Sequence, residues 1–450
     1  MEHQLVVVNA NKEKCKLKVN QRDVDVAFTI NQLRQEDKDQ DQHKAYLDRM
    51  VHRFNLKTQR VQRSQSGPCI FKLFGNLGKI YEGDYQRPHV VSLGPYHHGN
   101  EYLVDFDDKK WYFLKQVLLK KNVESGEGLS SFLKDVSLLE DSIRGCYASY
   151  GDVASLGSYD FLEMMLLDGV FIVELLRFLG KSQKGVDKYD DPFFVTPLMV
   201  PLMVADLLKL ENQLPFFVLE ALFTCSKTSE HGMDLLPLIN EAINLVFPLR
   251  TFVAYSPKHL LELVYRSLMP ESYTTCTDHR KQNKHMSNQT IQCVTELRRS
   301  GIKLMARQSS GILDIEFKNG LLEIPTININ DFTMNLITNC LAWEQCCIDA
   351  FTYITDYIYF LNCLINGPRD VALLCGDGII VRHSRDDASV VSFFNSLGKN
   401  ILVFNPKTSY LSRDMREIDT YYSSSWATLM RTLSSHNSSS FHSSMPSLMS

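Results

Sequence analysis

The stretch "DLLKLENQLPFF", residues 206–217, decides how the middle of this sequence is interpreted, because three polar side chains interrupt an apolar run. On a helix with about 100° between residues, Glu211 points in the same direction as the leucines. A buried carboxylate without partners costs several kcal/mol, so an inward acid needs hydrogen-bond donors or must be protonated. We therefore predict that Glu211 is buried and satisfied by at least two donors.

The other polar residues of this stretch separate into two sets on the same helical wheel. Asn212 lies at the edge of the apolar face, next to Glu211. Asp206, Lys209 and Gln213 fall on the polar side, which predicts contact with water for Gln213. Pro215 lacks an N–H group and is expected to kink the helix.

Two further apolar stretches also contain acids. In residues 159–180, "YDFLEMMLLDGVFIVELLRFLG", Asp168 lies at the centre of the apolar face. In residues 341–365, "LAWEQCCIDAFTYITDYIYFLNCLI", Glu344 lies at the border of that face. Both acids are therefore candidates for burial.

Inward-facing acids suit three kinds of role. They can form a general acid–base pair in an enzyme. They can bind metal, but the Glu-x-x-His spacing of di-iron bundles is missing from these helices. They can also form a structural network that accepts backbone N–H groups or pairs with Arg or His. We favour a structural buried polar network of Asp168, Glu211, Asn212 and Glu344, with no catalytic, cofactor-binding or metal-ligating residues and no cofactor.

The common catalytic and nucleotide-binding motifs are missing from the sequence. Patterns for a P-loop, a dinucleotide-binding turn, a nucleophile elbow and a zinc protease do not occur. Adjacent histidines in an extended segment point to opposite faces, which is poor geometry for one metal ion. The remaining candidate is a turn motif of unassigned role within "VSLGPYHHG", residues 91–99, made of Pro95, Tyr96, His97, His98 and Gly99.

Hydrophobic periodicity predicts a mainly α protein, a large multi-helix globular domain with a small β-hairpin element near 312–327. The hairpin is indicated by Asn319-Gly320, which suits the positive φ angles of a type I′ turn. Helices are expected at 107–121, 129–147, 158–180, 199–214, 216–225, 233–246, 257–268, 291–300, 333–365, 369–375 and 387–399.

Shifts in composition divide the chain into three parts. Residues 1–66 form a polar, variable and partly disordered extension, and residues 67–405 form the helical core domain. The polar linker 272–289 separates possible lobes at 67–271 and 290–405. Residues 406–450 form a Ser-rich tail that we expect to be disordered.

Composition narrows the class of protein. The chain has 450 residues and a net charge of −4, which gives no support for nucleic-acid binding. Eleven cysteines without a CxxC motif favour reduced thiols over a disulfide framework or a zinc ribbon. No signal peptide and no run of about 18 apolar residues is found. We therefore expect a soluble protein of the cytoplasm or nucleus, with peripheral membrane binding as the alternative.

Several stretches together resemble one family. "VSLGPYHHG", "DLLKLENQLPFF", "LDIEFKNGLLEIP" and "AWEQC" are similar, in this order, to the plant domain-of-unknown-function 247 family over about residues 69–403. The resemblance implies no common enzymatic activity. It implies membrane association through an apolar C-terminal segment, and some grass members are associated with self/non-self recognition in pollination. This sequence has no such segment after "LVFNPK", so integral membrane insertion is not expected here.

These observations favour a plant intracellular protein-interaction or signalling component without catalysis, whose partners are proteins of unknown identity. The alternative is an enzyme with an unrecognised site built around Asp168 and Glu211. An open pocket that holds both acids beside a histidine or a metal would support the enzyme. Sealed and fully hydrogen-bonded acids would count against it.

Overall fold

Helices dominate the part of the chain that the computed structural model describes, so the mainly α prediction is confirmed. The residues from Gly67 on form one compact unit. The predicted extension 1–66 and the predicted linker 272–289 lie outside the described residues. The structure describes residues 67–73, 85–121, 125–148, 150–183, 199–227, 234–248, 256–270, 291–309, 311–347, 350–383, 385–399, 401, 404–405 and 408–442.

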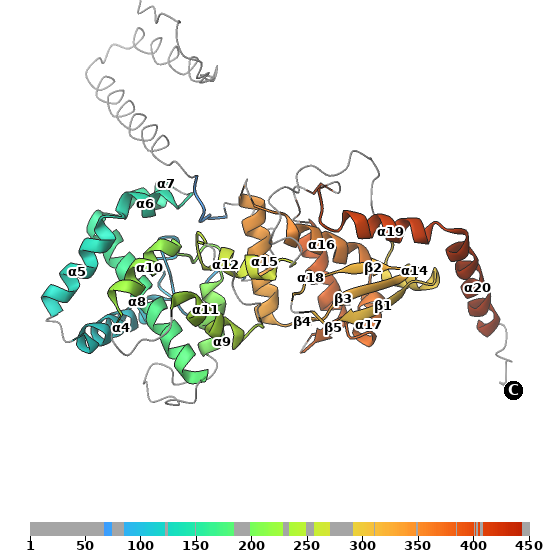
Figure 1. The fold of residues 1–450 in the computed structure, drawn as a ribbon, viewed down its shortest axis with the longest axis horizontal. Helices are drawn as coiled ribbons and strands as arrows, with labels where there is room; N and C mark the ends of the chain where they lie inside the picture. Colours follow the sequence, from blue (N-terminus) through green and yellow to red (C-terminus); the bar gives the residue numbers. More distant parts are fainter. Residues whose placement is uncertain are drawn as a thin grey trace, which may run out of the picture. The chain divides into compact units, whose positions relative to one another are not determined.

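Helix α8 (Ser158–Gln183) organises the first group of helices, because its middle is apolar on every side. Its residues Val170 to Val173 are all at most 1% exposed. A Cβ added to Gly169 would lie 2.3 Å from a methyl carbon of Leu222, so glycine lets two helices approach closely here. The helices packed on α8 are α4 (Asp107–Lys120), α5 (Ser125–Ser137), α10 (Phe216–Cys225) and α11 (Leu235–Asn244) (Figure 1).

Shorter elements complete this first group. They are the 3-10 helix η1 (Val104–Phe106), α6 (Glu140–Gly145), α7 (Tyr150–Ser155), α9 (Met199–Leu207) and α12 (Leu260–Leu268). An extended segment at residues 67–73 joins the group through a parallel bridge between Ile70 and Tyr147.

The second group contains the strands. Strands β1 (Lys303–Arg307), β3 (Leu321–Pro325) and β2 (Glu316–Lys318) form a sheet in this order, with β1 parallel and β2 antiparallel to β3. Asn319 and Gly320 connect β2 to β3 with φ angles of 51° and 79°, which confirms the predicted hairpin. A second pair joins β4 (Ile327–Ile329) to β5 (Ile380–Arg382) in parallel.

Helices surround these strands. Helix α15 (Asp331–Cys346) contacts α9 and α12 of the first group as well as α16 (Tyr353–Leu364) (Figure 1). One connected set of buried apolar side chains extends through both groups. The other helices are α14 (Val294–Arg299), α17 (Pro368–Gly376), α18 (Asp387–Lys399), α19 (Ser412–Tyr422) and α20 (Ser425–His442).

Four predictions about the elements differ from the structure. The expected helix 129–147 is divided into α5 and α6. Helix α9 ends at Leu207, residues 208–215 are not helical, and Pro215 precedes α10 with ψ of 133° instead of kinking one continuous helix. The expected helix 333–365 is divided into α15 and α16. Residues 412–442, expected to be disordered, form α19 and α20, and Met415 and Ile418 of α19 are buried because this face packs on β2.

Candidate functional site

The end of α9 and the non-helical loop that follows it lie against the non-helical segment 85–97, and the polar side chains of residues 206–213 are buried there. Asp206, Lys209, Glu211, Asn212 and Gln213 are each at most 7% exposed. These five residues, with the backbone of 85–97, are called the polar core below. The prediction that Gln213 faces water is wrong, because the helix on which the wheel was drawn ends at Leu207.

Asp206 receives a row of backbone N–H groups. His89 donates to both carboxylate oxygens at 2.9 and 3.0 Å, Val90 donates at 2.7 Å and Val91 at 3.1 Å. Successive N–H groups of this kind form an anion-binding concavity. Lys209 Nζ lies 3.7 Å from the same carboxylate and donates to the carbonyl of Arg87. This carboxylate is therefore satisfied by the chain itself.

The two amides of the loop tie its backbone to neighbouring segments. Asn212 accepts the Leu93 N–H at 2.7 Å and donates to the Val91 carbonyl at 3.1 Å. Gln213 donates to the carbonyls of Leu207 and Lys209 at 2.7 and 2.8 Å. Its own oxygen accepts the Leu261 N–H at 3.0 Å. Residues 208–215 are not helical, so their backbone groups lack the regular hydrogen bonds of a helix. The Gln213 amide satisfies two carbonyls here, those of Leu207 and Lys209, in place of helical N–H groups.

Glu211, predicted from the sequence, has two partners. The Leu73 N–H donates to Oε1 at 2.7 Å, and His97 Nε2 lies 3.3 Å from Oε2. The second contact is an ion pair only when His97 is protonated, and His97 Nε2 forms no hydrogen bond in this arrangement. The carboxylate thus holds the segment 67–73 and the turn after residue 94 at the same time.

Asp168 is 1% exposed and pairs with Lys110, which the sequence analysis did not single out. The Lys110 ammonium has three oxygens at 2.7 Å, from Asp168, Asp107 and the Ser92 carbonyl, which match its three hydrogens. The other oxygen of Asp168 accepts the Gly94 N–H at 2.8 Å. Burial opposes the charged form of Lys110, but the two carboxylates outweigh it and raise its pKa.

The turn motif packs on the polar core. Gly94 has φ of 70°, and an added Cβ would lie 2.9 Å from the Gln213 carbonyl oxygen. Pro95 and Tyr96 are buried, and the Tyr96 hydroxyl donates to the Ile70 carbonyl at 3.1 Å. His97 contacts Glu211 as described above, whereas His98 and Gly99 are exposed. The motif therefore has contacts that account for it without a ligand.

Glu344 belongs to a separate cluster at the break between α15 and α16. It accepts the N–H groups of Ile354 and Thr355 at 2.8 and 2.7 Å, and the Thr355 hydroxyl at 2.7 Å. Burial raises the pKa of Glu344 to about 7. Burial and the charge of Glu344 raise the pKa of Asp356, on the first turn of α16, to about 8.

The acids singled out from the sequence therefore lie at different places with different partners. Asp168 is bound to Lys110 and Gly94, Glu211 to Leu73 and His97, and Glu344 to the start of α16. Within the described ranges, no group of three His, Cys, Asp or Glu side chains could hold a metal ion. This arrangement fits the structural interpretation of the acids better than an acid–base pair.

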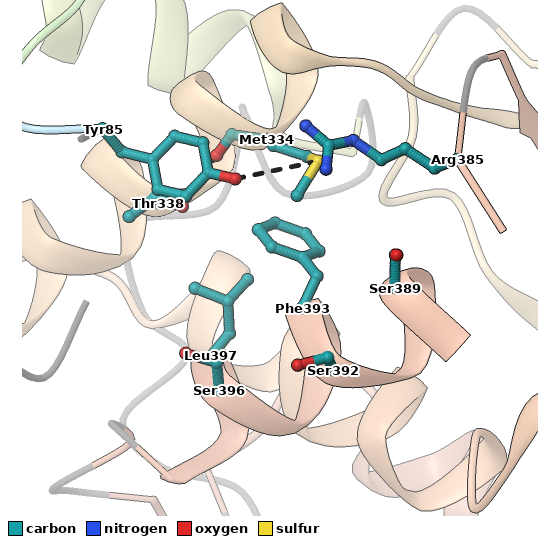
Figure 2. A pocket seen from close by; sticks show the side chains of 9 residues that line it. All are labelled: Tyr85, Met334, Thr338, Arg385, Ser389, Ser392, Phe393, Ser396 and Leu397. Atoms are coloured by element: carbon teal, nitrogen blue, oxygen red, sulfur yellow. Dashed lines mark hydrogen bonds between the residues drawn. The ribbon is translucent and has the colours of Figure 1, made fainter. Parts of the chain in front are cut away.

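A cavity of about 220 Å³ opens between α15 and α18 and is called the α15–α18 pocket. Figure 2 shows the Tyr85 hydroxyl and the Arg385 guanidinium pointing toward each other across Met334, with the ring of Phe393 beneath them. This pocket was not predicted from the sequence, although serines at i, i+3 and i+7 of one helix were a usable signal. Its lining consists of Tyr85, Met334, Thr338, Arg385, Ser389, Ser392, Phe393, Ser396 and Leu397.

One charged residue lines this pocket. Arg385 pairs with Asp331, whose side chain is 87% exposed. The Tyr85 hydroxyl has the sulfur of Met334 at 4.0 Å as its hydrogen-bond acceptor, which is a weak partner. Burial raises the pKa of Tyr85, so its hydroxyl keeps its proton at neutral pH. None of the buried acids described above lines the pocket.

Sequence comparison places this fold in a family. The sequence model of the family DUF247, described as "Plant protein of unknown function", matches residues 70–449. The chain therefore belongs to the DUF247 family, which confirms the resemblance inferred from its motifs. Among the residues that the structure describes, no helix is long and apolar enough to cross a membrane.

Two relatives come from Arabidopsis thaliana. The UPF0481 protein At3g47200 is 32% identical over 393 residues, which cover 81% of this chain and 80% of the relative. A more distant UPF0481 protein, At3g02645, is 20% identical over 439 residues, which cover 76% of this chain and 80% of the relative. No solved structure matches the chain.

Proposed function

We propose that this DUF247 protein is a non-catalytic plant protein that acts by binding another protein. The observation that carries the proposal is an exposed apolar row on helix α20. Trp426, Leu429 and Leu433 are 58, 51 and 52% exposed, and their i, i+3 and i+7 spacing puts them on one helical face. Helices that dock into apolar grooves of other proteins use anchors with this spacing.

The rest of helix α20 supports this use. Ala427 is buried, and α20 contacts α14 and α19, so the helix is held against the domain by another face. Arg431 donates to the Tyr422 carbonyl at 2.7 Å and lies over the Tyr422 ring, which fixes the angle between α19 and α20. Other exposed aromatic residues, such as Tyr102 and Tyr159, stand alone and need no partner.

The proposed compartment is the cytoplasm or nucleus. All nine cysteines among the described residues are free thiols. Thiols stay reduced in these compartments, whereas secreted domains of plants and animals use their cysteines in disulfides. The free thiols therefore support a cytoplasmic or nuclear location.

The proposal is tested by proximity labelling in plant tissue with the full chain. A triple variant, Trp426→Ser, Leu429→Ser and Leu433→Ser, is compared with wild type and with a control that removes two isolated exposed aromatics, Tyr102→Ser and Tyr159→Ser. We expect proteins labelled by wild type and by the control to be lost from the triple variant. Identical labelling by all three proteins would overturn the role of α20.

A further inference from the structure

We propose that the α15–α18 pocket binds a small amphipathic organic anion, a carboxylate joined to one aromatic ring or a short apolar chain. This inference rests on the pocket alone and does not depend on the protein interaction proposed for α20. Four properties of the pocket lead to it: its volume, its apolar floor, its single positive charge and its hydroxyl groups.

The volume limits the ligand to one ring with a short side chain. The cavity measures about 220 Å³. An engineered apolar cavity of about 150 Å³ in another protein holds one benzene molecule. The α15–α18 pocket therefore has room for a benzene ring and a few additional heavy atoms, but not for a nucleotide or a lipid chain.

The floor of the pocket is apolar and buried. Phe393 and Leu397 of α18 are 7 and 2% exposed, and Met334 of α15 is 3% exposed. An aromatic ring and a thioether sulfur are favourable neighbours for the face and edge of a second ring. Phe393 is itself held in place by edge-on contacts with Tyr85 and Phe394, at centroid distances of 6.3 and 5.3 Å. The floor is thus ordered before a ligand arrives.

The charge of the lining favours an anion. Arg385 is the one ionised residue among the nine that line the pocket. Its partner Asp331 is almost fully exposed, and ion pairs between such residues contribute little free energy. A ligand carboxylate can therefore replace Asp331 at small cost and accept two parallel N–H bonds from the guanidinium. Arg385 also lies just before α18, where the helix dipole adds positive potential.

The hydroxyl groups provide further donors on the same side. Figure 2 shows the Ser389 hydroxyl on the side of Arg385, whereas Ser392 and Ser396 lie beyond Phe393 and Leu397. The Tyr85 hydroxyl has the distant Met334 sulfur as its acceptor, so it is free to donate to a stronger one. A carboxylate beside Arg385 is such an acceptor.

The experiment titrates the full chain with three probes of one shape, which are 3-phenylpropionate, 3-phenylpropionamide and 3-phenylpropylamine, and with inorganic phosphate. Binding is followed by ligand-observed NMR and calorimetry. At about 0.3 kcal/mol per heavy atom, the roughly eleven heavy atoms of the acid give about 3.3 kcal/mol, which is a dissociation constant of about 4 mM. The amide and the amine are expected to bind at least about tenfold more weakly, because they lack the charge that pairs with Arg385.

Two variants locate the binding. Arg385→Gln is expected to weaken the acid by about tenfold or more and to leave the amide unchanged, because only the acid pairs with the guanidinium. Ser392→Phe fills the cavity and is expected to abolish binding of all three probes. Arg413→Gln on α19 is the matched control, since Arg413 is 63% exposed and pairs only loosely with acids of its own helix.

One outcome of these titrations supports the proposal, and four others overturn it. Preference for the acid that disappears in Arg385→Gln and persists in Arg413→Gln supports it. Equal binding of acid and amide, unchanged binding by Arg385→Gln, or no binding of the acid at about 10 mM overturns it, because a pocket of this kind should reach millimolar affinity. Binding of inorganic phosphate as tight as that of the acid also overturns it, since the apolar floor would then contribute nothing.

Discussion

The polar core and the α15–α18 pocket contain similar side chains and use them in opposite ways. In the polar core, Asp206, Asn212 and Gln213 meet backbone groups at hydrogen-bond distance on nearly every side. In the pocket, Arg385 and the serines of α18 border an open cavity. Tyr85 belongs to both, because its backbone is part of the polar core while its ring lines the pocket. Its carbonyl accepts a hydrogen bond from the side chain of Asn339 on α15 at 3.0 Å.

This difference separates structure from recognition. A buried polar group that is satisfied by the chain's own backbone fixes the course of a loop, and removing it leaves other groups unpaired. A polar group beside a cavity can be removed without leaving a buried partner unpaired. Stability measurements should therefore respond strongly to the polar core and weakly to the pocket.

Asp206→Ala is expected to have the largest effect on stability. It leaves the N–H groups of His89, Val90 and Val91 without this acceptor and removes the carboxylate that faces the buried Lys209 ammonium, which should cost about 3–5 kcal/mol. Urea unfolding measures this cost. Glu220→Gln on the exposed face of α10 is the control, and its cost should stay within about 0.5 kcal/mol. Similar costs for the two variants would mean that Asp206 is solvated.

Glu344→Gln is expected to remove a pH-dependent change of about 3 kcal/mol in the free energy of unfolding. The pKa of Glu344 is about 7 when folded and 4.5 in an open peptide. Between these values the unfolded chain has lost the proton that the folded chain keeps, so wild-type stability falls as the pH rises from about 4.5 to about 7. The raised pKa of Asp356 extends the loss toward pH 8.

The variant cannot titrate at this position, so its stability relative to wild type should improve across the same range. Unfolding by urea at several pH values from 5 to about 8 measures the difference between the two proteins. Parallel stability curves for wild type and Glu344→Gln would show that this carboxyl is already ionised at pH 5 and that its burial has no consequence for folding.

Gly94→Ala and Gly99→Ala form a matched pair within the turn motif. Both glycines have positive φ, 70° and 74°, so alanine costs about 1–2 kcal/mol at either position. At Gly94 the new Cβ also meets the Gln213 carbonyl at 2.9 Å, whereas at Gly99 nothing lies within 4 Å. We expect Gly94→Ala to cost about 1–3 kcal/mol more than Gly99→Ala, measured by thermal unfolding. Equal losses of stability in the two variants would show that Gly94 does not lie against the Gln213 carbonyl, and therefore that the turn motif does not pack on the polar core.

Arg385→Gln is expected to have the smallest effect on stability. Its ion pair with Asp331 is exposed and should contribute less than about 0.5 kcal/mol. Urea unfolding in the absence of any ligand is the measurement. A loss above about 2 kcal/mol would make Arg385 a structural residue and would weaken the comparison between the two regions.

Much of the fold could be predicted from the sequence because apolar periodicity and one turn signal were sufficient. Helices α10 and α18 begin and end as predicted, and Asn319-Gly320 marks the hairpin. The end of α9 at Leu207 and the end of α15 at Cys346 could not be predicted in this way. Contacts with distant segments accompany both ends, since the Leu210 N–H donates to the Asn339 side chain and the Tyr265 hydroxyl donates to the Phe351 carbonyl. Hydrophobic periodicity contains no information about such contacts.

The candidate sites were less predictable. Glu211 and Asp168 were found because a carboxylate on an apolar face is conspicuous on a wheel. Gln213 was placed in water because the wheel assumed a helix that in the structure ends at Leu207. Asp206 lies on that helix, and its burial follows from the backbone N–H groups of a distant segment. The pocket was missed because Tyr85, Met334 and Arg385 come from three separate segments of the chain.

Native-state hydrogen exchange of the wild-type protein tests the central claim most directly. The N–H groups of Val90, Val91, Leu93 and Gly94 belong to no helix or strand, and the account holds that buried Asp206, Asn212 and Asp168 accept them. We predict that these amides exchange with free energies close to that of global unfolding, as core amides do. Exchange at the rate of an open loop would contradict the account, because it would show that these polar side chains do not hold the chain together.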